Sequence, residues 1–195
     1  MKIRTLIAAA GLLVAAHASQ AQNLVTNGSF EANVQAAGTF GTYPTLTGWT
    51  GVTDIELRNN LAGVAQSGVN FVELDTTKNM SMFQDITAGG LVQLSFWYAP
   101  RWGTASDTLT YSLGGLTGNV LSTPGTGGWK QFSGTVDLGA FGTHRLTFAA
   151  AGASDGAGGS LDNVSVTAVP EPETYALMLA GLGLMGAVAR RRRQA

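Results

Sequence analysis

The chain has 195 residues and no cysteine, which excludes disulfides, thiolate metal sites and cysteine nucleophiles. Charged residues make up only 12% of the sequence, whereas glycine is abundant with 27 residues. Low charge with many turn-forming residues between apolar runs favours β-structure over a helical bundle. Residues 22–168 carry five basic and ten acidic side chains, a net charge of −5. Such a surface repels polyphosphate and argues against a nucleic-acid partner.

The N-terminal residues have the pattern of a secretory signal peptide. Two basic residues precede an apolar run over residues 6–16, and the small side chains Ser19 and Ala21 stand at positions −3 and −1 of a cleavage site. The alternative, a buried N-terminal helix, does not explain why the basic residues, the length of the apolar run and the small residues at the cleavage site all fit a signal peptide. Residues 1–21 therefore predict export across the inner membrane by the Sec machinery, with cleavage after Ala21; Ala16 and Ala18 offer a second possible cleavage site.

Alternation of apolar and polar residues recurs through residues 22–168 and predicts short β-strands. The strand-like runs cover residues 69–74, 81–86, 91–99, 108–113, 131–138, 146–150 and 161–169. Glycine-rich turns separate several of them, and no internal segment has a convincing helical period. The pattern predicts an all-β fold, an antiparallel β-sandwich in which each sheet has one buried and one solvent-exposed face.

The C-terminal residues 169–195 form a tail in three parts. A Pro-Glu-Pro sequence comes first, residues 174–189 contain no charge, and four arginines follow. We expect residues 174–189 to form a transmembrane helix with the arginines on the cytoplasmic side, although a length of about 24 Å is short for a bilayer core of roughly 30 Å. The tail residues of interest are Pro170, Glu171, Pro172, Arg190, Arg191, Arg192 and Arg193.

This order of features resembles the PEP-CTERM sorting signal. The resemblance is confined to the tail and implies processing near the Pro-Glu-Pro by exosortase, an integral-membrane enzyme similar to cysteine transpeptidases. Processing would release or re-anchor the ectodomain, so the expected location is the cell envelope, the cell surface or the medium. The signal also implies a Gram-negative host, often one that makes exopolysaccharide. An ordinary tail anchor is the alternative.

A second resemblance concerns the ectodomain. It opens with Asn27-Gly28-Ser29-Phe30-Glu31 and ends with the sequence LDNVSV over residues 161–166. These ends are similar to the galactose-binding-like jelly rolls of carbohydrate-binding modules and DUF642-like wall proteins, while the middle matches only in strand spacing. The resemblance implies a jelly roll whose first and last strands lie close together.

Glu31 and Asp162 are the candidate metal ligands. In the jelly rolls that the chain resembles, the matching residues commonly share a structural calcium with backbone carbonyls, and hard oxygen ligands suit this ion. A calcium would tie together the two ends of a disulfide-free extracellular domain. The alternative is that both carboxylates cap turns or accept hydrogen bonds from backbone amides.

Aromatic and basic side chains predict a sugar-binding surface. Flat rings stack on the CH faces of sugars, and arginines donate to hydroxyls. Alternation within residues 94–98 places Trp97 on the face opposite to the core, and the other candidates come from expected loops or strand faces. The alternative for each tryptophan is that it covers an edge or an end of the sandwich. The candidates are Trp49, Trp97, Arg101, Trp102 and Arg145.

Catalytic arrangements are poor. After export His144 is the only histidine, which cannot build a histidine-rich zinc site, and no nucleophile elbow is present. Glu73 and Asp75 stand two apart on an expected strand, where solvated or turn-bonding carboxylates are the simplest interpretation. We therefore expect a non-catalytic protein that binds or organises extracellular polysaccharide in a matrix or biofilm. The alternative is a structural or adhesive surface protein that acts through protein–protein contacts.

Overall fold

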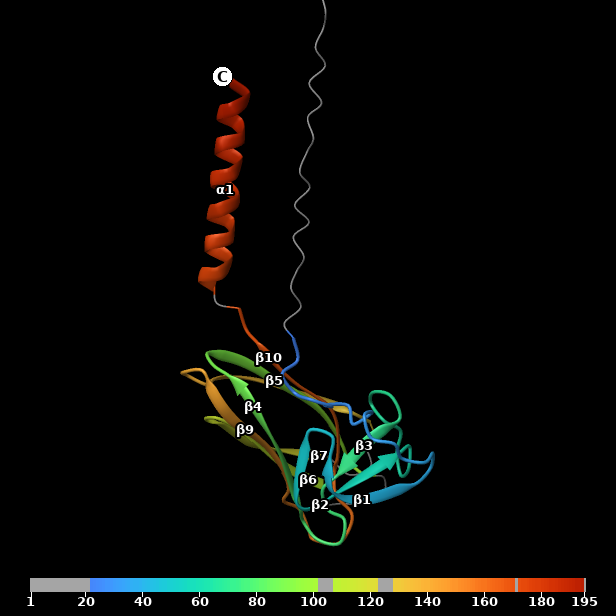
Figure 1. The fold of residues 1–195 in the computed structure, drawn as a ribbon. Helices are drawn as coiled ribbons and strands as arrows, with labels where there is room; N and C mark the ends of the chain where they lie inside the picture. Colours follow the sequence, from blue (N-terminus) through green and yellow to red (C-terminus); the bar gives the residue numbers. More distant parts are fainter. Residues whose placement is uncertain (1–21, 102–106, 123–127, 171, 195) are drawn as a thin grey trace, which may run out of the picture.

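The computed structural model describes residues 22–101, 107–122, 128–170 and 172–194 (Figure 1). The predicted signal peptide over residues 1–21 and the candidate Trp102 lie outside these ranges. Within them the chain forms a β-rich body followed by a C-terminal helix.

Antiparallel strands dominate the described residues, as the alternating pattern predicts. Their bounds in chain order are β1 (Phe40–Leu46), β2 (Trp49–Asn59), β3 (Asn70–Glu73), β4 (Ser81–Ala88), β5 (Leu91–Ala99), β6 (Asp107–Leu113), β7 (Leu116–Ser122), β8 (Lys130–Asp137), β9 (Gly142–Ala150) and β10 (Ser160–Ala168). The strands follow one another in the order β7-β6-β9-β4-β2-β3-β10-β5-β8, and β1 pairs with β2.

The long strand β2 passes from one layer of the sandwich to the other. Near its start Thr50 and Gly51 pair with β4, whereas the segment from Glu56 to Asn59 pairs with β3. One layer therefore contains β7, β6, β9 and β4, and the other contains β3, β10, β5 and β8, with β2 shared between them.

Aromatic side chains join the two layers. The ring of Phe96 in β5 lies edge-on to Phe148 of β9, with centroids 5.0 Å apart, and 5.3 Å from Tyr111 of β6. Phe96 and Phe148 are fully buried, and each large apolar side chain removed from water contributes roughly 1.5–3 kcal/mol. The predicted antiparallel β-sandwich is confirmed, and its core lies between these layers.

Trp49 belongs to this core, so the prediction that it binds sugar from a loop is wrong. It is the first residue of β2, is 2% exposed, and packs between the rings of Phe30 and Phe148. Its Nε1 donates a hydrogen bond to the carbonyl of Asn27 at 3.2 Å, which satisfies the one polar atom of the indole.

The first described residues run beside β10. Leu24 N donates to Val166 O, and Val164 N donates to Gly28 O, both at 2.8 Å. At this crossing a side chain on Gly28 would collide with the carbonyl of Val164, so the close approach requires glycine. The two ends of the ectodomain therefore lie side by side, as the jelly-roll resemblance implies.

Helix α1 (Pro172–Gln194) follows β10, as the apolar tail predicts (Figure 1). Arg190, Arg191 and Arg192 are exposed in its last turns, where positive charge interacts favourably with the helix dipole. Glu171 lies outside the described residues. Among the described residues no helix is long and apolar enough to cross a membrane, so the predicted transmembrane span over residues 174–189 is not confirmed.

Candidate functional site

The outward face of β2, β3 and β10 is buried, although an alternating strand in a sandwich normally turns this face to water. Glu56 and Arg58 of β2, Glu73 of β3 and Asp162 of β10 are all 4% exposed or less. Two loops reach this face: residues 60–69 between β2 and β3, and residues 151–159 between β9 and β10. Because buried charges must be paired, the loops that cover them have to supply hydrogen-bond partners for these side chains.

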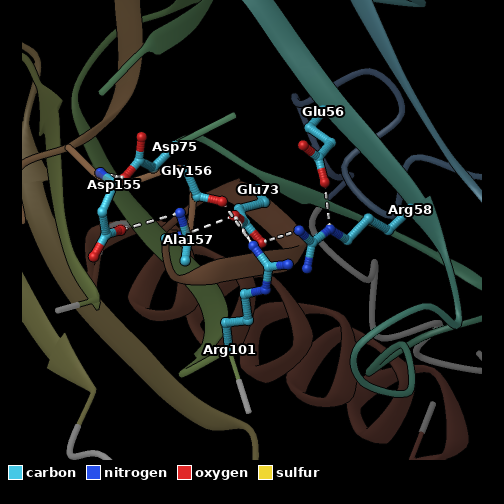
Figure 2. A network of polar contacts seen from close by, with 9 residues as sticks. Glu56, Arg58, Glu73, Asp75, Arg101, Asp155, Gly156 and Ala157 are labelled. Atoms are coloured by element: carbon cyan, nitrogen blue, oxygen red, sulfur yellow. Dashed lines mark hydrogen bonds and ion pairs between the residues drawn. The ribbon is translucent and has the colours of Figure 1, made fainter. Parts of the chain in front are cut away.

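Arg58 and Glu73 form the centre of an ion-pair network (Figure 2). Arg58 Nε lies 2.6 Å from Glu56 Oε1, and its Nη2 lies 2.6 Å from Glu73 Oε2. Arg101 Nη1 approaches Glu73 Oε1 at 3.4 Å and donates to the carbonyl of Gly156 at 2.7 Å. Two arginines and two carboxyl groups thus contact one another beneath the loops.

Glu73 also holds the second loop, because its Oε1 accepts a hydrogen bond from Gly158 N at 2.8 Å. Burial raises the pKa of Glu73 to about 7, although the charge of Arg58 and the Gly158 hydrogen bond oppose the shift. Asp75 accepts from the backbone N of Asp155 in the same loop at 3.1 Å. Neither carboxylate is solvated. Both accept hydrogen bonds from loop amides instead, which agrees with the turn-bonding interpretation of the sequence.

Glu31 and Asp162 clasp the loop 60–69 from two sides. Glu31 Oε1 accepts from Val69 N at 2.8 Å and Asn70 N at 2.7 Å. Asp162 Oδ2 accepts from the backbone N atoms of Gln66 and Ser67, each at 2.9 Å. The alternative that these carboxylates bond backbone amides therefore describes the contacts in the structure. We call this arrangement the clasp.

The two carboxylates of the clasp also influence each other. Burial raises the pKa of Asp162 to about 7, hydrogen bonds from the loop lower it, and the negative charge of Glu31 raises it further. Two hard-oxygen donors that repel each other suit the coordination of a divalent cation such as calcium. The described residues contain no group of three His, Cys, Asp or Glu side chains that could hold a metal, so backbone carbonyls would have to complete such a site.

A pocket of about 320 Å³ opens between the clasped loop, the end of β5 and the start of β8. Trp129 forms one wall, and its ring lies edge-on to Phe71, with centroids 5.8 Å apart. Trp129 Nε1 donates to Val64 O at 2.8 Å, which joins this wall to the clasped loop. Arg101 and Ser160 supply polar atoms to the lining. We call it the Trp129 pocket.

The structure brings only part of the predicted sugar-binding set to this place. Arg101 lines the Trp129 pocket. Trp97 is half-buried on the same layer, opposite Asp162 in β10 and Gln131 in β8. Arg145 lies on the other layer and binds both oxygens of Asp85, at 2.7 and 2.9 Å, so the prediction that it shares the site is wrong.

Trp129 itself was missed by the sequence interpretation. It follows a glycine-rich stretch and precedes β8, so no alternation marks its orientation. A lone tryptophan after a run of glycines is nevertheless unusual, because a large apolar ring in a loop requires packing partners. That signal would have added it to the candidates.

The raised pKa of Glu73 makes stability depend on pH. The folded protein keeps a proton on Glu73 that the unfolded chain releases. The stability of the folded protein relative to the unfolded chain therefore falls as pH rises from 4.5 to 7. Relative to Glu73→Gln, which does not titrate, we expect the free energy of unfolding of the parent to fall by roughly 3 kcal/mol over this range. Denaturant titrations of both proteins at several pH values measure the change. A constant difference would contradict the raised pKa.

Comparison with known proteins identifies the tail directly: residues 168–193 match the PEP-CTERM protein-sorting motif. The chain is also 32% identical over 156 residues to a multifunctional-autoprocessing repeats-in-toxin protein of Vibrio vulnificus. A similar match, 29% identical over 167 residues, is found in Vibrio cholerae. These alignments cover 75% and 81% of this chain, but the chain spans only 3% of the length of either toxin.

Solved structures show the same fold. A structure of TmCBM61 in complex with beta-1,4-galactotriose has a TM-score of 0.51 at 17% identity and covers 76% of this chain and 99% of its own. A domain of the MgGH51 α-L-arabinofuranosidase has a TM-score of 0.53 at 13% identity, over 74% of this chain and 26% of that enzyme. The protein therefore carries a PEP-CTERM sorting motif behind an ectodomain with the jelly-roll fold of carbohydrate-binding modules.

Proposed function

We propose that the protein is an exported, non-catalytic module that binds extracellular polysaccharide through the Trp129 pocket. The PEP-CTERM motif implies sorting by exosortase and export to the cell envelope or surface. In this function, Sec exports the chain, and the ectodomain then binds or organises the polysaccharide matrix. The observation that carries the binding function is the Trp129 pocket on a jelly-roll fold.

The lining of the pocket supports this function chemically. Phe71, Ala99 and Pro100 give it an apolar floor against which the CH groups of a sugar ring can pack. Trp129 is half-buried and held at its Nε1 by Val64, so its ring is ordered before any ligand arrives. A preordered aromatic wall avoids the entropic cost of fixing a side chain on binding.

The carboxylates near the pocket support a binding function rather than hydrolysis. Glu73 has the pKa of a general acid, but it is fully buried and bound by Arg58, Arg101 and the Gly158 amide. A catalytic acid must reach the substrate within hydrogen-bond distance. Asp75, the second carboxylate of the strand, is 1% exposed and holds a loop.

Replacement of Trp129 tests the proposed function. We expect Trp129→Ala to weaken binding to polysaccharide by about tenfold or more, because it removes a stacked aromatic anchor. Affinity gel electrophoresis with host exopolysaccharide, and calorimetry with β-1,4-galactotriose as a defined probe, measure the loss. The control is Phe141→Ala, since Phe141 is 80% exposed in a loop outside the pocket lining. Concentration-dependent self-assembly with no glycan binding by the parent would instead favour a structural or adhesive protein.

Calcium at the clasp is a separate proposal. Glu31 and Asp162 would hold the ion, and the ion would relieve their repulsion and fix the loop 60–69. We expect millimolar calcium to raise the melting temperature of the protein and a chelator to reverse the gain. Glu31→Gln should abolish the calcium response, whereas Asp85→Asn, which alters an exposed ion pair on the other layer, should retain it. An unchanged melting temperature of the parent with calcium would refute the proposal.

A further inference from the structure

A second pocket of about 340 Å³ lies beside the Trp129 pocket, and the two share Ala62 and Arg101 in their linings. Its wall includes Glu56 and Arg58 of β2 together with the hydroxyl-bearing Thr76 and Thr77. We call it the Arg58 pocket. The two pockets are therefore neighbours, and a ligand long enough to extend past Ala62 and Arg101 would contact both.

Arg58 lines this second pocket and carries a buried donor that has no partner among the described residues. The side chain is 3% exposed, and its Nε and Nη2 are bound to Glu56 and Glu73. Its Nη1 is buried and has no hydrogen-bond partner among the described residues, and Figure 2 shows this nitrogen apart from the dashed contacts. An unpaired buried donor on a charged group destabilises the folded protein, and an acceptor oxygen from a ligand would relieve this cost.

The surrounding charges decide which acceptor fits. Glu56 already balances the charge of Arg58 at 2.6 Å, so an added anion gains little from this guanidinium. A ligand carboxylate on Nη1 would also stand beside Glu56, and like charges at close range repel. A hydroxyl accepts from Nη1 without this penalty and can donate its own proton to a carboxylate or a threonine. The net charge of −5 over residues 22–168 adds to the bias against anions.

The clasped loop places the two pockets with respect to each other. Ala62, which lines both, has a left-handed backbone with φ of 55°, and Asn60 has φ of 48°. Such conformations cost energy in residues other than glycine and persist only where neighbouring structure enforces them. The clasp and the Trp129–Val64 hydrogen bond supply that enforcement, so the shared wall is part of an ordered structure.

Resting on the proposed function, we propose that the ligand is an uncharged glycan of at least two sugar residues. One ring packs against Trp129, and a neighbouring residue places a hydroxyl oxygen on Arg58 Nη1 in the Arg58 pocket. Monosaccharides fill only one pocket and bind weakly. Uronic-acid glycans of the same linkage are rejected because their carboxylate meets Glu56.

The test uses the purified full-length protein and a panel of neutral mono-, di- and trisaccharides, with the C6-oxidised uronic-acid form of each trisaccharide as its matched control. We expect the best neutral trisaccharide to bind at least about tenfold more tightly than its monosaccharide and its oxidised form. Arg58→Lys keeps the charge but removes the forked donor, so it should abolish the gain from the second residue, measured as the ratio of trisaccharide to monosaccharide affinity in the same variant. If Arg58→Lys does not fold, Thr77→Val, at an exposed position of the same pocket, should reduce the same gain by about threefold.

The outcomes separate the two proposals. Equal affinity for monosaccharide and trisaccharide, or preference for the oxidised form, would overturn this inference while leaving polysaccharide binding at Trp129 intact. The inference would also be overturned if only Trp129→Ala lost the higher affinity for the trisaccharide over the monosaccharide, while Arg58→Lys and Thr77→Val kept it. If the parent binds nothing on the panel and nothing in host exopolysaccharide, the proposed function fails and this inference fails with it.

Discussion

Burial of charge on the outward face of a sheet is the constraint on which the site depends. Glu73 and Asp162 lie in adjacent strands and are fully buried, yet they point away from the core of the sandwich. A buried carboxylate is tolerated only with hydrogen bonds or counter-charges around it. Each of the two therefore binds backbone amides of a covering loop, Glu73 at Gly158 and Asp162 at Gln66 and Ser67. The charges thus fix the loops, and the loops form the pockets.

Fixed loops have a direct consequence for binding. The Trp129 pocket is built largely from loop residues, and loops that order only on binding would reduce affinity. Here the clasp holds residues 60–69 at one end, and the indole of Trp129 holds Val64 within it. Gly68 is required at the clasp, because its φ is +68° and a side chain there would collide with the Glu31 carboxyl. The same contacts that stabilise the loop therefore preserve the shape of the ligand site.

The sequence predicted the architecture well because period-two alternation follows from sheet geometry alone. The strand over residues 91–99 and the helix of the tail are found where the pattern indicated. The proximity of Glu31 and Asp162 was inferred only from the family resemblance. The two residues are 131 positions apart, and local sequence patterns do not show which distant segments lie side by side.

The candidate site was predicted less well, for a physical reason. In β2 the charged residues Glu56 and Arg58 alternate with Ile55 and Leu57, which locally indicates a solvated face. Burial of that face depends on loops whose course is set by tertiary hydrogen bonds. Trp49 and Trp129 show the same limit, because alternation cannot decide whether a tryptophan beside a glycine turns into the core or lines a pocket.

Binding at the Trp129 pocket is tested most directly by the indole N–H spectrum of the protein during titration with a neutral polysaccharide fragment. Trp129 donates its Nε1 proton to Val64 at the pocket wall, whereas the Nε1 of Trp49 is sealed in the core. If ligand binds in the Trp129 pocket, the Trp129 indole resonance shifts progressively during the titration while that of Trp49 stays in place. Binding accompanied by a shift at Trp97 and none at Trp129 would contradict it.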